Sequence, residues 1–349
     1  MRSFQHAETF DPVPGRVVAL LRRIDVGAGA AGRYVDQLPE LLSGLAESAR
    51  IESVTASSAI EGVLVDDTRR PGLLDGRTRR FRNRSEAEFA GYRAALDHLL
   101  QTDPGPLSTG LILHLHRVLL SLSGGAGGRF KLDDNVVVAY DPDGTRQVLF
   151  TAVSARETSS YVSELVDRAN DALVSGMTHP LLVVSAFVLD LLCIHPFSDG
   201  NGRVARLLTT SLLSRAGYGA VRYVSLEQPV LERKAEYYES LAASTEGWFD
   251  DGRHTLWPWA AFLLECLAET YDRFEQRVTT SSGAGTKQQR VRDFVLLHGP
   301  ATFQMADIRR SMPGVSDQTI HLVLRQLKAV GQVENDGTGR SASWTRAPG

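Results

Sequence analysis

The longest apolar run of the 349-residue chain extends from Leu181 to Ile194, and its one charged residue is Asp190. The run is too short to span a bilayer, although it is long enough for several helical turns. A helix that is apolar on all sides must be covered by other elements of the fold. The sequence therefore predicts a buried central helix surrounded by further helices.

Composition narrows the class of protein. Apolar residues make up 43% of the chain and charged residues 23%, as in a globular protein of two or three domains. A net charge of −3 argues against a chain that coats nucleic acid or membrane along its whole length. Both cysteines, Cys193 and Cys266, lie in apolar helical runs, so we expect buried, reduced thiols. No secretory signal is visible, and we expect a cytoplasmic protein without a membrane contact.

Apolar periodicity and turn signals predict a mainly α fold with one β-hairpin. The hairpin pairs residues 135–140 with 147–150 across the turn signal Asp141–Gly144. Helices are expected at 34–61, 85–100, 107–122, 159–175, 180–194, 203–216, 228–243 and 257–276.

The C-terminal part has a different pattern. A polar linker, 277–286, precedes helices at 288–298, 304–311 and 316–330 and two strands near 333–335 and 343–345. This order predicts a winged helix-turn-helix domain over 287–349. Its nine Lys and Arg against five Asp and Glu favour a nucleic-acid contact, with a protein-binding or packing role as the alternative. The remaining boundaries are a helical N-terminal region, 1–106, and a catalytic core, 107–276.

Directly after the central helix comes the segment His195-Pro-Phe-Ser-Asp-Gly-Asn-Gly-Arg-Val-Ala-Arg206. Its glycine-rich turn opens a helix, where free N–H groups and the helix dipole favour an anion. Gly200 and Gly202 let the backbone approach a phosphate closely. Arg203 and Arg206 share one helix face and can clamp a polyphosphate.

Two further residues of this segment add chemistry to the anion site. Asp199 is an oxygen ligand suited to the Mg²⁺ that accompanies nucleotide phosphates. His195 titrates near neutral pH and can act as a general base. Together these residues indicate phosphoryl or nucleotidyl transfer.

The same segment resembles the HxFxDGNGRxxR signature of the Fic family. The matching residues are His195, Phe197, Asp199, Gly200, Asn201, Gly202, Arg203 and Arg206. The resemblance implies that ATP is attacked at its α-phosphorus, that AMP is attached to a protein Ser, Thr or Tyr hydroxyl, and that pyrophosphate leaves. It also implies that Asp199 holds Mg²⁺, that Asn201 and Arg203 bind phosphates, and that Arg206 meets the γ-phosphate.

An upstream segment, Ser57-Ser-Ala-Ile-Glu61-Gly62, is similar to the inhibitory motif [S/T]xxxE[G/N] of that family. Glu61 would pair with Arg206 and take the place of the γ-phosphate, so that ATP binds unproductively. The alternative is an ordinary Glu-Gly end of a helix. We expect inhibition, because the downstream motif is complete.

Two more matches concern substrates. Similar Fic proteins carry a β-hairpin flap that pairs with the target backbone, which makes Val136, Val137 and Val138 the candidate strand. In the segment Glu236-Tyr-Tyr238 the second tyrosine, Tyr238, would line the adenine pocket. Several relatives have Asn at the position of Thr245, which puts that further contact in doubt.

The sequence therefore predicts a Fic adenylyltransferase restrained by Glu61, with ATP, Mg²⁺ and a protein target that can include the chain itself, as a monomer or homodimer. One alternative is a DNA-binding regulator whose Fic core acts as a sensor. The other is a Fic enzyme that uses another nucleotide or removes AMP.

Overall fold

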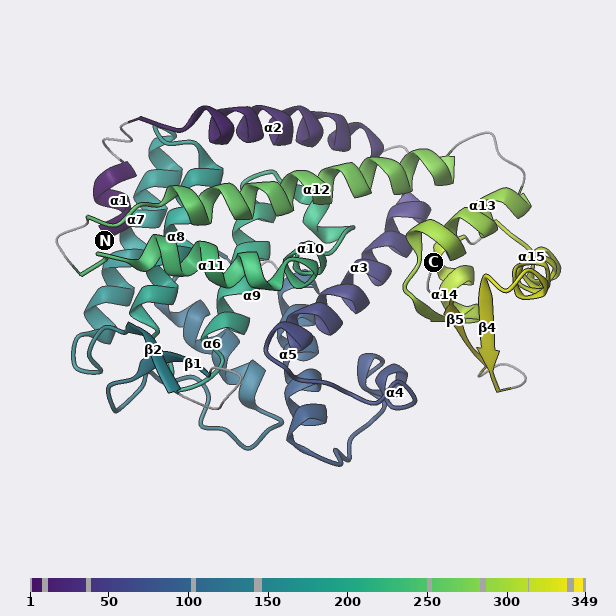
Figure 1. The fold of residues 1–349 in the computed structure, drawn as a ribbon, viewed down its shortest axis with the longest axis horizontal. Coiled ribbons are helices and arrows are strands. Elements are labelled where there is room, and N and C mark those ends of the chain that lie inside the picture. The colour runs from purple at the N-terminus through teal and green to yellow at the C-terminus, as the bar shows by residue number, and fades with distance from the viewer. Residues whose placement is uncertain are drawn as a thin grey trace.

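The computed structural model describes residues 2–7, 12–35, 39–101, 105–140, 146–249, 253–282, 287–312, 314–337 and 342–347. The helices are α1 (Arg2–Ala7), α2 (Gly15–Val35), α3 (Pro39–Ile60), α4 (Arg70–Leu74), α5 (Arg84–Gln101), α6 (Thr109–Leu120), α7 (Thr158–Ser175), α8 (Pro180–Ile194), α9 (Asn201–Arg215), α10 (Glu227–Glu232), α11 (Lys234–Thr245), α12 (Trp257–Ser282), α13 (Lys287–Asp293), α14 (Met305–Ser311) and α15 (Asp317–Ala329), with short helical turns η1 (Gly219–Arg222) and η2 (Phe294–His298). The strands are β1 (Val136–Tyr140), β2 (Arg146–Thr151), β3 (Thr302–Gln304), β4 (Val333–Asp336) and β5 (Ser343–Arg346). The mainly α-helical fold is confirmed (Figure 1).

Helix α8 is the buried centre of the fold, as its apolar sequence predicts. Almost all of its side chains are buried, and α1, α7, α9, α11 and α12 pack around it. Pro180 occupies the first turn, where a missing N–H costs nothing, and the helix ends at His195 in a left-handed conformation. His195, the predicted general base, therefore directly follows a helix that is packed on all sides.

The charge inside this helix, Asp190, has a structural function. Its fully buried carboxylate accepts hydrogen bonds from the backbone N–H and hydroxyl of Ser3 and from the indole N–H of Trp248. Burial raises the pKa of Asp190 to about 6, although these hydrogen bonds act in the opposite direction. Asp190 therefore fastens α1 and the segment before α12 to the centre of the core.

Helix α2 is not among the helices expected from the sequence, because the three glycines in its stretch 27–32 lower the helix propensity. Tertiary packing overrides that preference, since α2 runs along α12 (Figure 1). A Cβ at Gly27 would lie 3.0 Å from the Tyr271 ring, so glycine lets the two helices approach closely.

Three predicted boundaries need correction. Helix α12 continues to Ser282, because Val278 is still buried, so the predicted linker 277–286 begins inside a helix. The single helix expected at 228–243 is divided at Arg233, whose backbone is not helical. The helix expected from residue 34 begins at Pro39, a residue suited to a first helical turn.

Strands β1 and β2 form the predicted antiparallel hairpin, with a register shift between Val137 and Val138. Val136 is exposed and Val137 is half-buried, whereas the side chain of Val138 and the turn Asp141–Gly144 lie outside the described part of the structure.

The C-terminal module, residues 287–347, has its own apolar core and a three-stranded antiparallel sheet in the order β3-β5-β4. The elements lie close to where the sequence places them, and the short strand β3 is additional. The assignment as a winged helix-turn-helix stays a prediction. Helix α14 of this module packs on α3 (Figure 1).

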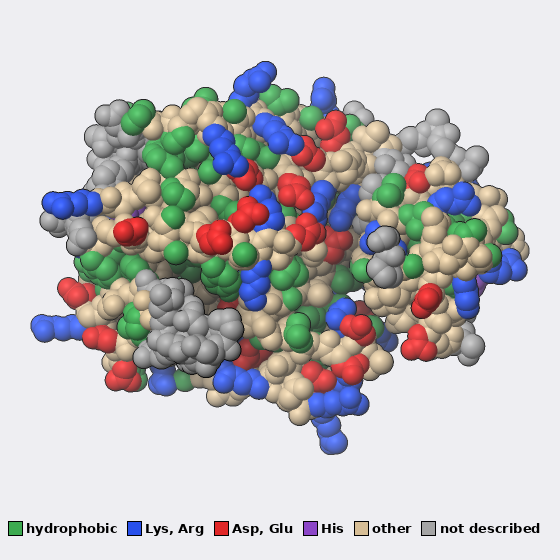
Figure 2. Space-filling view, viewed as in Figure 1, with side chains coloured by type: hydrophobic (Ala, Val, Ile, Leu, Met, Phe, Trp, Pro, Cys, Tyr) green, Lys and Arg blue, Asp and Glu red, His purple; other side chains and the backbone are tan. Residues whose placement is uncertain are grey.

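The surface shown carries both signs of charge. On the face drawn in Figure 2, basic and acidic side chains are interspersed. Within the described ranges, every helix is too short or too polar to cross a membrane.

Close packing of α5 on α6 yields a stability test. A Cβ at Gly91 would lie closer than 3.0 Å to the backbone carbonyl of Leu119. We expect Gly91→Ala to lower the free energy of unfolding by about 1–3 kcal/mol through overpacking. Denaturant titration measures this change. The control Gly110→Ala, at an exposed helical glycine with ordinary contacts, should be neutral or stabilising, and equal losses in both variants would contradict the packing argument.

Candidate active site

The turn between α8 and α9 presents the end of one helix to the start of the next. His195 closes α8 with φ 50°, and Gly200 precedes α9 with φ 83°, a conformation that glycine adopts without strain. The first N–H groups of α9 have no acceptor within the helix. They are therefore available to an anion, and phosphate binding at this position stays a prediction.

His195 has the tautomer that a general base needs. Its Nδ1 lies 3.2 Å from the carbonyl oxygen of Leu192, which can only accept, so Nδ1 carries the proton. Nε2 is then the acceptor. Burial lowers the pKa of His195, the Lys131 charge acts in the same direction, and the Leu192 hydrogen bond and Glu61 oppose them. The ring is thus neutral and basic near pH 7.

The side chain of Asn201 holds the turn. Its amide oxygen accepts from the Phe197 N–H at 2.9 Å, and its amide nitrogen donates to the Phe197 carbonyl at 2.7 Å. Asn201 is buried. The predicted phosphate contact is thereby left to its backbone N–H, because the amide group is already engaged on both sides.

Glu61 reaches the second arginine of the motif, as predicted. Glu61 follows the last residue of α3, and its Oε1 lies 2.7 Å from the Nη2 of Arg206. Ser57 binds the same guanidinium through its hydroxyl, at 2.8 Å, and its carbonyl, at 3.2 Å. A Cβ at Gly202 would lie closer than 3.0 Å to the Glu61 carboxylate, so glycine makes room for this pair.

Electrostatics strengthen the contact between Glu61 and Arg206. Burial acts to raise the pKa of Glu61. The charge and the hydrogen bond of Arg206 act in the opposite direction and outweigh burial, so the net shift of the pKa is downward. The pKa of Arg206 is raised, because Glu61 and neighbouring groups outweigh the desolvation of the guanidinium.

Arg203 is part of a ring of alternating charges. Its guanidinium donates to Glu88 at 2.9 Å and to Asp199 at 3.0 Å. Arg84 bridges the same two carboxylates and closes the ring. Neither Glu88 nor Arg84 belongs to the motif, and their spacing in the sequence gave no signal of this contact.

Asp199 fits a magnesium ion that arrives with a nucleotide. Its side chain is 43% exposed, and its two oxygens are paired with the buried Arg203 and with Arg84, whose side chain is 72% exposed. The described residues contain no cluster of three or more His, Cys, Asp or Glu that could hold a metal alone. Magnesium is commonly held by one or two carboxylates with substrate phosphates, and this donor set suits that mode.

His116, on α6, supports the turn between α8 and α9. Its ring stacks on Phe197 with centroids 3.7 Å apart. Nδ1 accepts from the Gly128 N–H, so Nε2 carries the proton and donates to the Asp199 carbonyl at 3.2 Å. Burial lowers the pKa of His116 to about 4, which keeps this ring neutral.

Tyr238 lies beside the end of α3. Its hydroxyl is 3.4 Å from the Ile60 carbonyl, and 43% of the residue is exposed. Its neighbour Tyr237 is buried. An adenine contact for Tyr238 stays a prediction, as does the pairing of Val136, Val137 and Val138 with a target.

Comparisons with known proteins match the region of the chain that contains these residues. Residues 106–213 match the Fic/DOC family. Proteins named protein adenylyltransferase Fic are similar over about half of the chain: 29% identity over 164 residues in Drosophila melanogaster and 31% over 166 residues in Drosophila willistoni. Each match covers 47% of this chain and 28% of the fly protein. The chain therefore corresponds to under a third of those relatives.

Solved structures show the same fold. A Fic family protein from Desulfovibrio desulfuricans G20 superimposes with a TM-score of 0.63 at 20% identity, over 96% of this chain and 97% of that one. Fic-1 from C. elegans gives a TM-score of 0.54 at 23% identity, over 76% of this chain and 74% of that one. At these identities the likeness concerns the fold alone.

The contact between Glu61 and Arg206 predicts a pH-dependent stability. Since the pKa of Glu61 is lowered by folding, its contribution is present above the ordinary value of 4.5 and is lost as the pH falls through the folded pKa. We expect the difference in unfolding free energy between wild type and Glu61→Gln to shrink on acidification below pH 4.5. Urea titrations over a pH series measure it, with exposed Glu239→Gln as control. A pH-independent difference would exclude the charged pair as its source.

Proposed function

The chain contains a Fic domain in residues 106–213, and on that basis we propose that it is a protein adenylyltransferase that transfers AMP from ATP to a Ser, Thr or Tyr hydroxyl. One observation carries the proposal. His195 has its proton on Nδ1, which leaves Nε2 as the acceptor, and it ends α8 six residues before α9 begins with unpaired first-turn N–H groups. A base beside a phosphate site is the arrangement that nucleotidyl transfer needs.

In the proposed reaction, Nε2 of His195 takes the proton of the target hydroxyl. The hydroxyl oxygen then forms a bond to the α-phosphorus as the bond to pyrophosphate breaks. The N–H groups of the first turn of α9, with Arg203 and Arg206, hold the negative charge that moves onto the leaving phosphates. General-base assistance contributes roughly 10²–10⁴ in rate. Bound Mg²⁺ would neutralise phosphate charge, with Asp199 as its protein ligand.

The same geometry supports autoinhibition. Arg206 binds Glu61 and Ser57 together, so a γ-phosphate that seeks Arg206 has to displace a carboxylate from a buried guanidinium. A charged hydrogen bond in such a position is among the stronger polar contacts. Occupation of Arg206 by Glu61 would leave ATP in a pose in which the α-phosphorus is out of line with the hydroxyl.

Four further proposals accompany this function. They concern a target protein that can be the chain itself, homodimer formation, use of another nucleotide, and removal of AMP. A DNA or protein contact by residues 287–349 also stays a prediction. It depends on the positive charge of the C-terminal module, and exposed Arg325 and Lys328 on α15 belong to that charge.

Labelling with radioactive ATP tests both the activity and its restraint. We expect Glu61→Gly to increase self-labelling at least about tenfold, because Arg206 becomes available to the γ-phosphate. Adding His195→Ala should reduce the signal by roughly 10²–10⁴.

The matched control is Glu246→Gly, at an exposed glutamate just after α11. It should label like the wild type. Labelling that does not depend on His195 would exclude the proposed base, and labelling unchanged by Glu61→Gly would exclude autoinhibition. Parallel reactions with other labelled nucleotides separate ATP use from the alternatives.

A further inference from the structure

His195 has a backbone conformation that needs external support. It is the one residue other than glycine with a positive φ among the described residues. A residue with a side chain is strained in this left-handed backbone conformation, which persists only where the surrounding structure fixes it. The side chain of Asn201 binds the backbone of Phe197 and does not reach residues 194–196. Other groups must therefore hold that part of the backbone.

Lys131 supplies contacts on both sides of His195. Its Nζ donates to the carbonyl of Ile194 at 3.2 Å, and its backbone N–H donates to the carbonyl of Pro196 at 2.9 Å. Lys131 lies in the segment between α6 and β1, and only 4% of the residue is exposed. A buried ammonium group is costly unless it is paired or hydrogen-bonded, and the acceptors of Lys131 lie at the turn that carries His195.

Asn135 extends this contact to the hairpin. Its Oδ1 accepts from the Lys131 Nζ at 2.7 Å, and its Nδ2 donates to the Phe197 carbonyl at 3.0 Å. Asn135 directly precedes β1, and its own carbonyl accepts from the Ala152 N–H after β2. Lys131 and Asn135 therefore join the base of the hairpin to the carbonyls of Ile194, Pro196 and Phe197.

We propose that Lys131 is a positioning residue for the proposed transfer reaction: it holds the strained backbone of His195 and thereby fixes the orientation of the imidazole. This proposal depends on the function proposed for His195. Lys131 acts through the backbone and by its charge, with Asn135 as its partner.

The charge of Lys131 acts on the ring itself. Burial lowers the pKa of His195 and Lys131 lowers it further, whereas the Leu192 carbonyl and the Glu61 carboxylate act to raise it. The pKa of Lys131 is lowered by burial to about 8, so this group remains charged at neutral pH. Loss of the ammonium group should therefore make the His195 ring easier to protonate.

The test compares Lys131→Met with Lys131→Gln in the Glu61→Gly background of the full chain. The matched control is Lys287→Met, at an exposed lysine of α13. We expect both Lys131 variants to lose about 10- to 100-fold in maximal labelling rate, since small displacements of a reacting group have effects of this size. The KM for ATP should stay within about twofold, because Lys131 acts on the base and not on the phosphates.

A second readout does not need activity. Nitrogen-15 NMR of the imidazole rings, with His195→Ala to assign the signal, gives the pKa and tautomer of His195. We expect its pKa to rise in both Lys131 variants, and Lys131→Gln retains a polar side chain if Lys131→Met does not fold. An unchanged labelling rate or an unchanged ring titration overturns the positioning function. If Glu61→Gly itself shows no labelling, the proposed transferase activity fails and the ring titration alone decides the question for Lys131.

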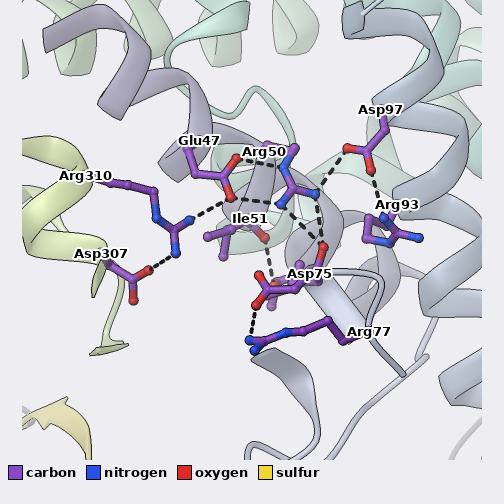
Figure 3. Close-up of polar contacts among 11 residues, drawn as sticks. Glu47, Arg50, Ile51, Asp75, Arg77, Arg93, Asp97, Asp307 and Arg310 are labelled. Atoms are coloured by element: carbon purple, nitrogen blue, oxygen red, sulfur yellow. Dashed lines mark hydrogen bonds and ion pairs between the residues drawn. The ribbon is translucent and has the colours of Figure 1, made fainter. Parts of the chain in front are cut away.

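A second, independent observation concerns the opposite end of the inhibitory helix α3. Gly44 lies against the backbone of α14, where a Cβ would come closer than 3.0 Å to both the Ser311 Cα and the Arg310 carbonyl oxygen. Figure 3 shows the polar contacts beside it: Arg310 binds Glu47 at 3.0 Å, and Glu47 also binds Arg50 at 2.8 Å. The C-terminal module thus packs directly on the helix that carries Ser57 and precedes Glu61.

We infer that the C-terminal module braces α3 in its inhibitory position, so that displacement of the module weakens the hold of Glu61 on Arg206. The close backbone contact at Gly44 contributes most, because half-exposed ion pairs such as Glu47–Arg310 are weak. A rigid helix transmits a shift at Gly44 to its far end, where Ser57 and Glu61 bind.

The full-length variant Gly44→Leu, which wedges the two surfaces apart, tests this inference. We expect self-labelling to rise toward the level of Glu61→Gly, with Arg310→Glu giving a smaller rise. Arg309→Glu is the matched control, because the neighbouring Arg309 binds Asp317 of α15 instead of α3. Amide hydrogen exchange over residues 53–61 should also accelerate in Gly44→Leu. Unchanged exchange there overturns the brace even if no variant labels.

Discussion

The buried guanidinium of Arg206 connects the parts of this molecule that matter for its chemistry. It belongs to α9, yet it binds the hydroxyl and carbonyl of Ser57 on α3 and the carboxylate of Glu61 just beyond. A buried charge is tolerated only when it is paired. Glu61 satisfies that requirement in the resting chain, and a phosphate group could satisfy it equally well. The same electrostatic need therefore serves both the proposed inhibition and the proposed nucleotide binding.

Around this contact, one group of side chains holds the turn between α8 and α9, and another group belongs to the proposed nucleotide site. Asn201, His116 and Lys131 are committed to backbone groups of the turn. Arg203 and Asp199 face the more exposed charge ring with Arg84. Such a division is expected where a strained backbone must stay fixed while a charged ligand enters and leaves.

Much of the fold could be predicted because it follows local rules. The apolar run of α8 predicted a buried central helix. The turn signal Asp141–Gly144 between two apolar segments predicted the hairpin of β1 and β2. Local rules fail where packing overrides propensity. The glycine-rich α2 is helical because it packs on α12, and α12 continues to Ser282 because Val278 is still covered. These extensions depend on neighbours that no short window of sequence contains.

The sequence by itself determined which groups are available for the proposed chemistry, namely a histidine, a glycine-rich turn at a helix start, two arginines and a distant glutamate, since short motifs fix residue type and spacing. Only the tertiary structure decided how these groups are used. It committed the Asn201 amide to Phe197, brought Glu88 and Arg84 to Arg203, placed Lys131 on both sides of His195, and set the C-terminal module on α3. The physical reason is that hydrogen bonds and close packing depend on distances between groups that are far apart in the chain, whereas motif chemistry depends on neighbours along it.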